Sequence, residues 1–194
     1  MLMKRIIGAF TFRKEVYAEV EKDVEFTGTA WLLVVIVSFL NQIGQLPGFG
    51  FSHFGKWLLS AIVTVAFSVA GFALGAFVIS WLGKTLFKAD VDFGEMVRVA
   101  GLAYVWNVVG VIGIVGFIPA LACILAPLVF IAAIAGLVAW LFAAKEALDL
   151  DWGPTIITVL IAWVISFVVT AIAGVILGLF GLGAAGIASA IQGG

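Results

Sequence analysis

The longest uncharged stretch of the chain runs from Val99 to Ala144, and its 46 residues include no Asp, Glu, Lys or Arg. As one α-helix, this stretch would be about 70 Å long, which is more than two hydrocarbon cores of a bilayer. It therefore has to fold back on itself. The glycines and the proline of "GIVGFIPAL" supply turn and helix-stop chemistry near its middle. We expect a helix at about 96–115, a turn, and a second helix at about 119–144.

The composition places these helices in a membrane. Hydrophobic residues make up 64% of the chain, charged residues make up 11%, and the mean hydropathy is +1.28. A soluble domain carries roughly twice that charged fraction, so the polar surface is too small to cover a globule in water. We therefore predict an all-α, polytopic transmembrane helical bundle in contact with the lipid bilayer. Its five spans are expected at about 27–43, 57–82, 96–115, 119–144 and 155–180, followed by a Gly/Ala-rich tail at 181–194.

The charged residues lie almost entirely on one side of the predicted spans. Residues 1–26 and the loops near 83–95 and 145–154, with Arg98, hold nine of the ten basic residues and all eleven acidic residues, whereas Lys56 lies alone on the other side. By the positive-inside rule, we expect the N-terminus in the cytoplasm and the C-terminus outside. The predicted location is the plasma (inner) membrane of a prokaryote, crossed several times.

The segment before the first span, residues 1–26, is predicted to contain an amphipathic helix. Val16, Tyr17, Val20 and Val24 recur at helical spacing in "FRKEVYAEVEKDVEF", and charged residues occupy most of the other positions. Such a helix lies on the membrane surface or packs on the cytoplasmic loops. The pattern fits both a helix that is merely solvated and a helix that docks a partner.

The residues needed for catalysis or metal binding are sparse. Nucleophilic or metal catalysis requires clustered His, Cys, Asp or Glu. The chain has one histidine, His53, and one cysteine, Cys123, in different segments. We therefore predict no catalytic residues, no metal site, no cofactor and no enzymatic activity. The net charge of −1 argues against nucleic acid as a partner.

Transport would require polar residues inside the bilayer, and the predicted spans hold few. Ion and proton carriers place ionisable residues there. Only Arg98 lies within a span, in its first turn, where it can pair with Glu95 or extend to the surface. Asn107 is the strongly polar residue in mid-span. It is interpreted as a helix-packing residue or, in a small-molecule carrier, as a substrate contact.

Small residues four apart predict close helix approach in two spans. Gly71 and Gly75 fall in the second predicted span, and Gly174 and Gly178 fall in the fifth. Because glycine has no side chain, this spacing lets two helices approach closely. We expect the four glycines to support packing within the bundle or a face between copies of the chain.

The two charged loops are the candidate contact surface. Asp92 and Glu95 have the spacing of a capping box, which predicts a helix start, and Asp151 precedes the last span as an N-cap. We interpret the charges either as partner contacts or as solvated turns that set the topology. The candidate contacts are Lys84, Lys88, Asp90, Asp92, Glu95, Arg98, Lys145, Glu146, Asp149 and Asp151.

Three stretches of the chain resemble the Yip1-domain family of integral membrane proteins. They are "KRIIGAFTFRKEVYAEVEKD", "FGEMVRVAGLAYVWNVVGVIGIVG" and "VAWLFAAKEALDLDWGPTIITVLIAWVI", and the likeness covers nearly the whole chain. The resemblance implies five transmembrane helices with a cytoplasmic N-terminus. Eukaryotic members look like trafficking factors that bind prenylated Rab GTPases. This chain looks like a short prokaryotic member, for which the family implies no activity.

Three hypotheses about function remain open at this point. The first is a non-enzymatic membrane protein that scaffolds partner proteins or organises the bilayer. The second is an accessory subunit of a large respiratory or photosynthetic membrane complex, whose docking would suit the aromatic segment Phe49, Phe51 and Phe54. The third is a small-molecule carrier. Partners are therefore expected among other membrane proteins, with a homo-oligomer as a further form.

Overall fold

The computed structural model of the chain describes residues 2–179, and these residues form helices and short connections. The predicted tail at 181–194 lies outside the described residues. The elements are α1 (Leu2–Phe10), α2 (Lys14–Lys22), α3 (Phe26–Ile43), α4 (Leu46–Phe49), η1 (Phe51–His53), α5 (Phe54–Phe87), α6 (Phe93–Ala103), η2 (Tyr104–Phe117), α7 (Pro119–Leu148) and α8 (Trp152–Leu179).

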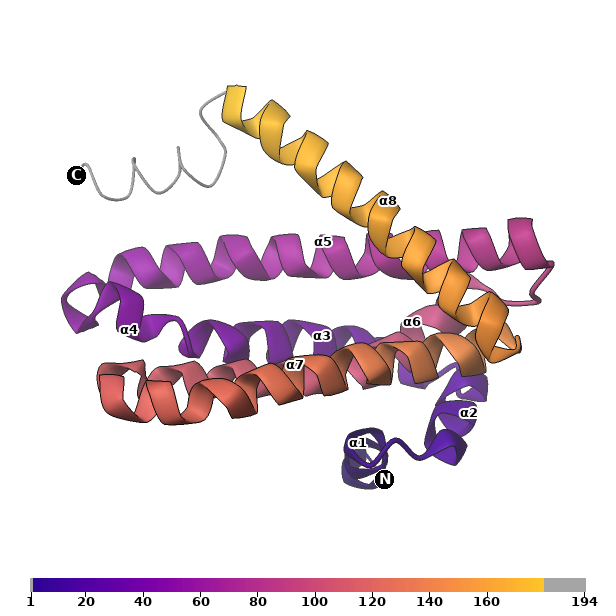
Figure 1. Cartoon of the computed structure of the whole chain (residues 1–194), viewed down its shortest axis with the longest axis horizontal. Coiled ribbons are helices and arrows are strands. Elements are labelled where there is room, and N and C mark those ends of the chain that lie inside the picture. Colours follow the sequence, from indigo (N-terminus) through magenta and orange to yellow (C-terminus); the bar gives the residue numbers. More distant parts are fainter. Residues whose placement is uncertain (1, 180–194) are drawn as a thin grey trace.

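The long helices lie side by side along the longest axis of the molecule (Figure 1). α3, α5, α7 and the continuous pair α6–η2 form the bundle, whereas α8 leaves it at an angle. Four segments are long and apolar enough to cross a membrane, and the apolar stretch Trp152–Ile165 of α8 is shorter. The prediction of an all-α membrane bundle is confirmed. The number of five spans and their orientation stay predictions. The four membrane-capable segments are Phe26–Ile43, Trp57–Phe87, Phe93–Phe117 and Cys123–Leu148.

The capping box predicted at the start of α6 is present. Asp92 is the N-cap, its Oδ1 accepts from the backbone N–H of Glu95 at 2.8 Å, and its own N–H donates to Glu95 Oε2 at 2.7 Å. Two backbone donors that an α-helix leaves unpaired at its N-terminus are thereby satisfied. From Met96 to Ala103 every residue of α6 is buried, so this cap fixes the start of the most enclosed helix in the described bundle.

Removal of the cap gives a first prediction. We expect Asp92→Ala to lower the free energy of unfolding by about 1 kcal/mol, because the Glu95 N–H loses its acceptor. Asp90→Ala, at an exposed position two residues earlier, is the matched control and should leave stability unchanged. Thermal unfolding of the two variants in the same detergent measures the difference. Equal unfolding temperatures for the two would contradict the cap's contribution.

The third predicted span, at about 96–115, lies within the membrane-capable segment Phe93–Phe117, but this segment is not α-helical throughout. The α-helix ends at Ala103 and a 3₁₀-helix of 14 residues, η2, continues to Phe117. Runs of 3₁₀-helix longer than three or four residues are uncommon. The physical reason lies in a repeat of three that we missed, in which Asn107, Gly110, Gly113 and Gly116 follow one another at steps of three. Residues three apart eclipse one another in a 3₁₀-helix, so Gly110, Gly113 and Gly116 form one face without side chains, the glycine face.

The glycine face of η2 lies directly against α3 and the segment after it. A β-carbon on Gly110 would collide with the side chain of Asn41, and one on Gly113 would lie 2.6 Å from the backbone oxygen of Gly44. One on Gly116 would lie 3.3 Å from Pro47. The 3₁₀ geometry thus stacks the glycines where two backbones meet, which 3.6 residues per turn would not do.

The 3₁₀ segment also matches the length of η2 and α6 to that of α7. α7 has 30 residues and is about 45 Å long, and it runs back alongside the 25 residues Phe93–Phe117. As an α-helix those 25 residues would reach about 38 Å, whereas the larger rise of a 3₁₀-helix extends them to about 45 Å. The segment Phe93–Phe117 therefore has about the same length as α7, although it has fewer residues.

Candidate functional site

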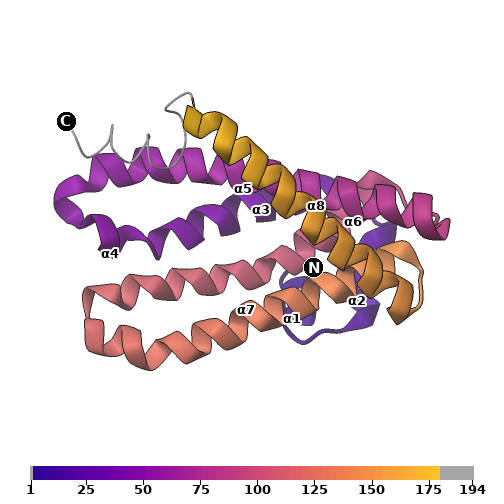
Figure 2. The same cartoon turned by 45° about the horizontal axis from the view of Figure 1, so that its top comes forward.

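The predicted contact residues gather at one end of the bundle, which we call the charged end and define as residues 14–25, 84–98 and 145–151. The α5–α6 and α7–α8 connections both lie at this end, and α2 packs beside it on α6 and α7 (Figures 1 and 2). The other end carries α4, η1 and the turn between η2 and α7. Three segments far apart in the sequence therefore form one surface.

The predicted amphipathic helix docks on the bundle through two of its four apolar residues. Tyr17 and Val20 are fully buried against the core, Val16 is half-buried, and Val24 is 71% exposed. Burial raises the pKa of the Tyr17 hydroxyl. That hydroxyl has no hydrogen-bond partner among the described residues. α2 is thus held mainly by apolar packing.

Arg98 joins α6 to the end of α2. Its side chain is 5% exposed, its Nε donates to the backbone oxygen of Glu21 at 2.7 Å, and its guanidinium reaches the hydroxyl of Thr27 at 3.5 Å. The sequence suggested a pair with Glu95 or an extension to the surface, and both are wrong. The ion pairs found among the described residues are those of Arg5. Because Glu21 is in the last turn of α2, Arg98 places a positive charge at the negative end of that helix.

The pKa of the Glu21 carboxyl is sensitive to charged residues of the two neighbouring segments of the charged end. Burial, and then the negative charges of Asp149 and Glu95, raise the pKa of its carboxyl. Glu146 acts in the same direction, whereas Lys22 opposes the change. Carboxylates from α2, α6 and α7 are therefore near enough to repel one another.

A pH dependence of α2 docking follows from this. A carboxyl whose pKa is raised in the folded state binds its proton more tightly there, so its contribution to stability is present at low pH and is lost as pH rises from its ordinary value of 4.5 through the raised pKa. We expect α2 to become more sensitive to protease over that window. Glu21→Gln should reduce the dependence, whereas Glu15→Gln, at an exposed position of α2, should not. An unchanged pH profile for Glu21→Gln would count against this assignment.

The remaining predicted contacts are more accessible, and two have an unusual backbone. Lys88 has φ 56° and Asp149 has φ 49°, and each ends a long helix, α5 or α7, in the left-handed conformation. Lys145 lies over the Trp152 ring at 5.5 Å, and Glu146 is half-buried. The exposed members of the predicted set are Lys84, Lys88, Asp90, Asp92, Asp149 and Asp151.

A short helix that sequence reasoning missed, α1, lies across the bundle and is seen end-on in Figure 1. Arg5 pairs with Glu19 at 2.6 Å and with Asp23 at 2.8 Å, which ties α1 to α2. The indole N–H of Trp106 donates to the Ala9 oxygen at 3.3 Å, which ties α1 to η2. The signal was present in "LMKRIIGAF", where Leu2, Ile6 and Phe10 recur at helical spacing and basic residues lie between them.

The predicted packing residues lie in different surroundings. A β-carbon on Gly71 would meet nothing within 4 Å, and one on Gly75 would touch the Trp140 ring at 3.5 Å. Gly174 and Gly178 belong to α8, at positions whose packing lies outside the described part of the structure. Asn107 lies on η2 and contributes its backbone oxygen to an interhelical bond that Asn41 Nδ2 donates at 3.0 Å.

The described residues contain no group of three or more His, Cys, Asp or Glu placed to hold a metal ion. His53 Nδ1 lies 3.2 Å from the Phe49 oxygen and 3.1 Å from the Ser52 hydroxyl in the connection before α5. Cys123 is exposed on α7. The histidine and the cysteine therefore lie apart from the charged end.

A comparison with models of protein families matches residues 7–174 to the Yip1 domain. The match begins within α1 and ends within α8, so it includes all three segments of the charged end. No curated protein and no solved structure matches the chain.

Proposed function

The chain belongs to the Yip1 domain family, and from this premise and the geometry of the charged end we propose that it is a non-enzymatic scaffold that holds partner proteins at the membrane surface. One observation carries the proposal. The α5–α6 and α7–α8 connections, which expose charged residues such as Asp90 and Asp151, lie at the same end of the bundle as α2, which packs on α6 and α7 (Figure 1). Such a fixed array of charges suits recognition of a protein partner.

The backbone at the charged end supports a contact role. A residue other than glycine costs roughly 1–2 kcal/mol in the left-handed conformation, and aspartate tolerates it better than lysine. Lys88 and Asp149 both adopt this conformation and both expose a charged side chain. Glycine would end both helices with less strain. Charged residues at these two positions therefore favour a function beyond ending a helix.

The proposal includes a placement in the cell. The bundle would cross the plasma membrane of a prokaryote five times, with the segment 1–26 and the charged end in the cytoplasm and the tail 181–194 outside. The nearly one-sided distribution of charge supports this orientation. The partners would be other membrane proteins, together with lipid along the apolar helix faces.

The test uses the left-handed positions, because their substitution removes charge without harming the fold. In Lys88→Gly/Asp149→Gly, we expect unfolding temperature to stay equal or to rise, since both glycines relieve backbone strain. The full chain is extracted from its own membrane in mild detergent, and the particle is analysed by native electrophoresis and mass spectrometry. The wild-type protein should co-migrate with a partner, and the double variant should migrate without it.

The control variant is Gln45→Ala, at an exposed position of the opposite end, and it should retain the partner. A double variant that retains the full complement of partners would contradict a contact role for the charged end. Loss of a large complex from a variant of the opposite end, where Phe51 is 73% exposed, would favour the accessory-subunit hypothesis instead.

A further inference from the structure

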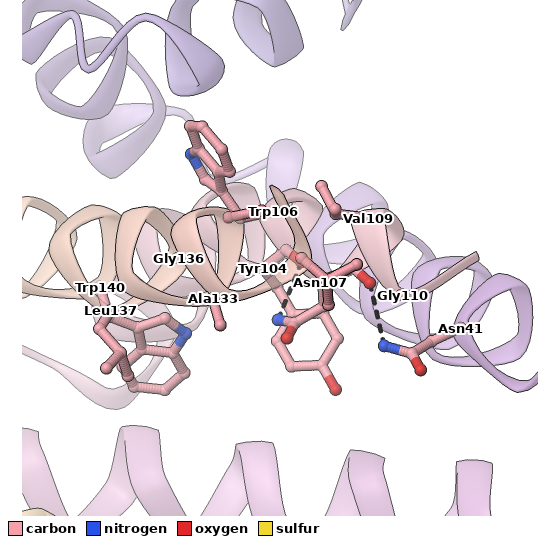
Figure 3. A pocket seen from close by; sticks show the side chains of 12 residues that line it. Asn41, Tyr104, Trp106, Asn107, Val109, Gly110, Ala133, Gly136, Leu137 and Trp140 are labelled. Carbon is pink, nitrogen blue, oxygen red and sulfur yellow. Dashed lines mark hydrogen bonds between the residues drawn. The ribbon is translucent and has the colours of Figure 1, made fainter. Parts of the chain in front are cut away.

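A cavity of about 460 Å³ lies between η2 and α7, with one wall from the end of α3. Its volume is within the range of small-molecule sites. Small residues of α7, Ala133 and Gly136, line one side, and the aromatic rings of Tyr104 and Trp140 form walls (Figure 3). Because α3, η2 and α7 belong to segments long and apolar enough to cross a membrane, we expect hydrocarbon to be the medium outside this cavity.

Three hydrogen-bonding groups at this cavity have no partner among the described residues. Asn107 Nδ2 donates to the Tyr104 oxygen at 3.2 Å, and Asn41 Nδ2 donates to the Asn107 oxygen, but neither amide Oδ1 accepts a hydrogen bond there. The indole N–H of Trp140 likewise finds no described acceptor, whereas the Trp106 N–H is bound to Ala9. Asn107 is exposed although it lies in mid-helix. Unpaired polar groups in hydrocarbon are costly and mark functional positions.

We propose that this cavity binds a membrane-dissolved amphiphile with an apolar body and one hydroxyl group. The hydroxyl donates to the amide oxygen of Asn107, which lies between Trp140 and Asn41 (Figure 3), and accepts from the indole N–H of Trp140, so one group satisfies both kinds of vacant partner. The apolar body occupies the space beside Ala133 and Gly136. Water alone would satisfy the amides but would leave the apolar lining wet. The site is separate from the charged end, so this inference does not depend on the proposed scaffold function.

The test uses a photoactivatable analogue of 1-dodecanol as the probe on the purified full chain in nanodiscs. Labelled peptides are identified by mass spectrometry, and unlabelled 1-dodecanol competes against dodecyl methyl ether, which has the same body but cannot donate a hydrogen bond. We expect label on α7 and η2, and competition by the alcohol about fivefold to tenfold stronger than by the ether, as one net hydrogen bond provides.

Three variants separate the parts of the site. Ala133→Phe fills the cavity from an exposed position and should abolish site labelling, whereas Ile131→Phe, which is exposed on α7 outside the cavity, should not. Asn107→Leu should equalise the alcohol and the ether. Trp140→Phe keeps an aromatic ring but removes a donor from which both oxygens accept, so it should weaken competition by the alcohol and by the ether alike and leave their ratio unchanged.

Two outcomes would overturn the inference. Labelling that persists unchanged in Ala133→Phe would show that the probe contacts only the lipid-facing surface. Equal competition by alcohol and ether in the wild-type protein would remove the hydroxyl from the proposed ligand. Thermal unfolding of each variant, measured in the same nanodiscs, confirms that a loss of label does not reflect loss of the fold.

Discussion

Gly113→Ala is expected to lower the free energy of unfolding by about 3 kcal/mol, through the addition of one methyl group. The new β-carbon would lie 2.6 Å from the backbone oxygen of Gly44 and 3.2 Å from its Cα. These are backbone atoms, so no side-chain rotation relieves the contact, and η2 has to separate from the segment after α3. Overpacking of a close contact costs about 1–3 kcal/mol or more. Unfolding followed by denaturant titration in detergent measures the change.

The matched control for this prediction is Gly71→Ala. Its β-carbon would meet nothing within 4 Å, and Gly71 lies within α5. Alanine is favoured over glycine in a helix interior by about 1 kcal/mol, so the control should be neutral or slightly stabilising. If Gly113→Ala proves as stable as Gly71→Ala, the close contact along the glycine face of η2 does not exist as described.

Arg98→Met is expected to loosen the docking of α2 on the bundle and to cost about 2 kcal/mol. Methionine is shorter but keeps most of the apolar stem, and the oxygen of Glu21 loses its charged donor at 2.7 Å. A hydrogen bond to a charged group contributes about 1.5–3 kcal/mol, and the positive charge at the end of α2 adds to it. Hydrogen exchange of the amides of Lys14–Lys22 should rise in the variant, because α2 is held otherwise by Tyr17 and Val20.

Two further substitutions distinguish the causes. Arg98→Lys keeps the charge but lacks the planar fork, so it should recover only part of the protection of α2. Lys88→Met removes an exposed charge from the same connection and should leave α2 protected. Equal exchange in Arg98→Met and in the wild-type protein would show that apolar packing alone holds α2.

Local chemistry made some parts of the fold predictable. Asp92 and Glu95 satisfy each other's backbone donors within four residues, so the start of α6 could be recognised from their spacing. The turn before Pro119 followed from the impossibility of one helix through 46 uncharged residues. Both inferences depend on neighbours in the chain or on the bilayer, and neither needs a tertiary partner.

The same approach failed where a distant partner decides the structure. Asn107, Gly110 and Gly113 were assigned to an α-helix because an apolar span is read with 3.6 residues per turn. Their spacing of three indicates a 3₁₀-helix only once the backbone of Gly44 is known to lie against them. Lys84, Lys145 and Glu146 were assigned to loops, but they lie in the last turns of α5 and α7. Arg98 was expected to pair with Glu95 or to extend to the surface, whereas its partner is the backbone oxygen of Glu21.

By itself, the sequence determined that this protein is an all-helical membrane bundle with its charges gathered in a few short segments. Hydrophobic length and charge position are properties of the chain, and the bilayer imposes the same requirement on every such chain. Only the tertiary structure decided that η2 is a 3₁₀-helix, that α2 closes the charged end and that Arg98 is buried at the end of α2. These features arise because backbone contacts and hydrogen bonds between distant segments outweigh the small energy differences between local conformations.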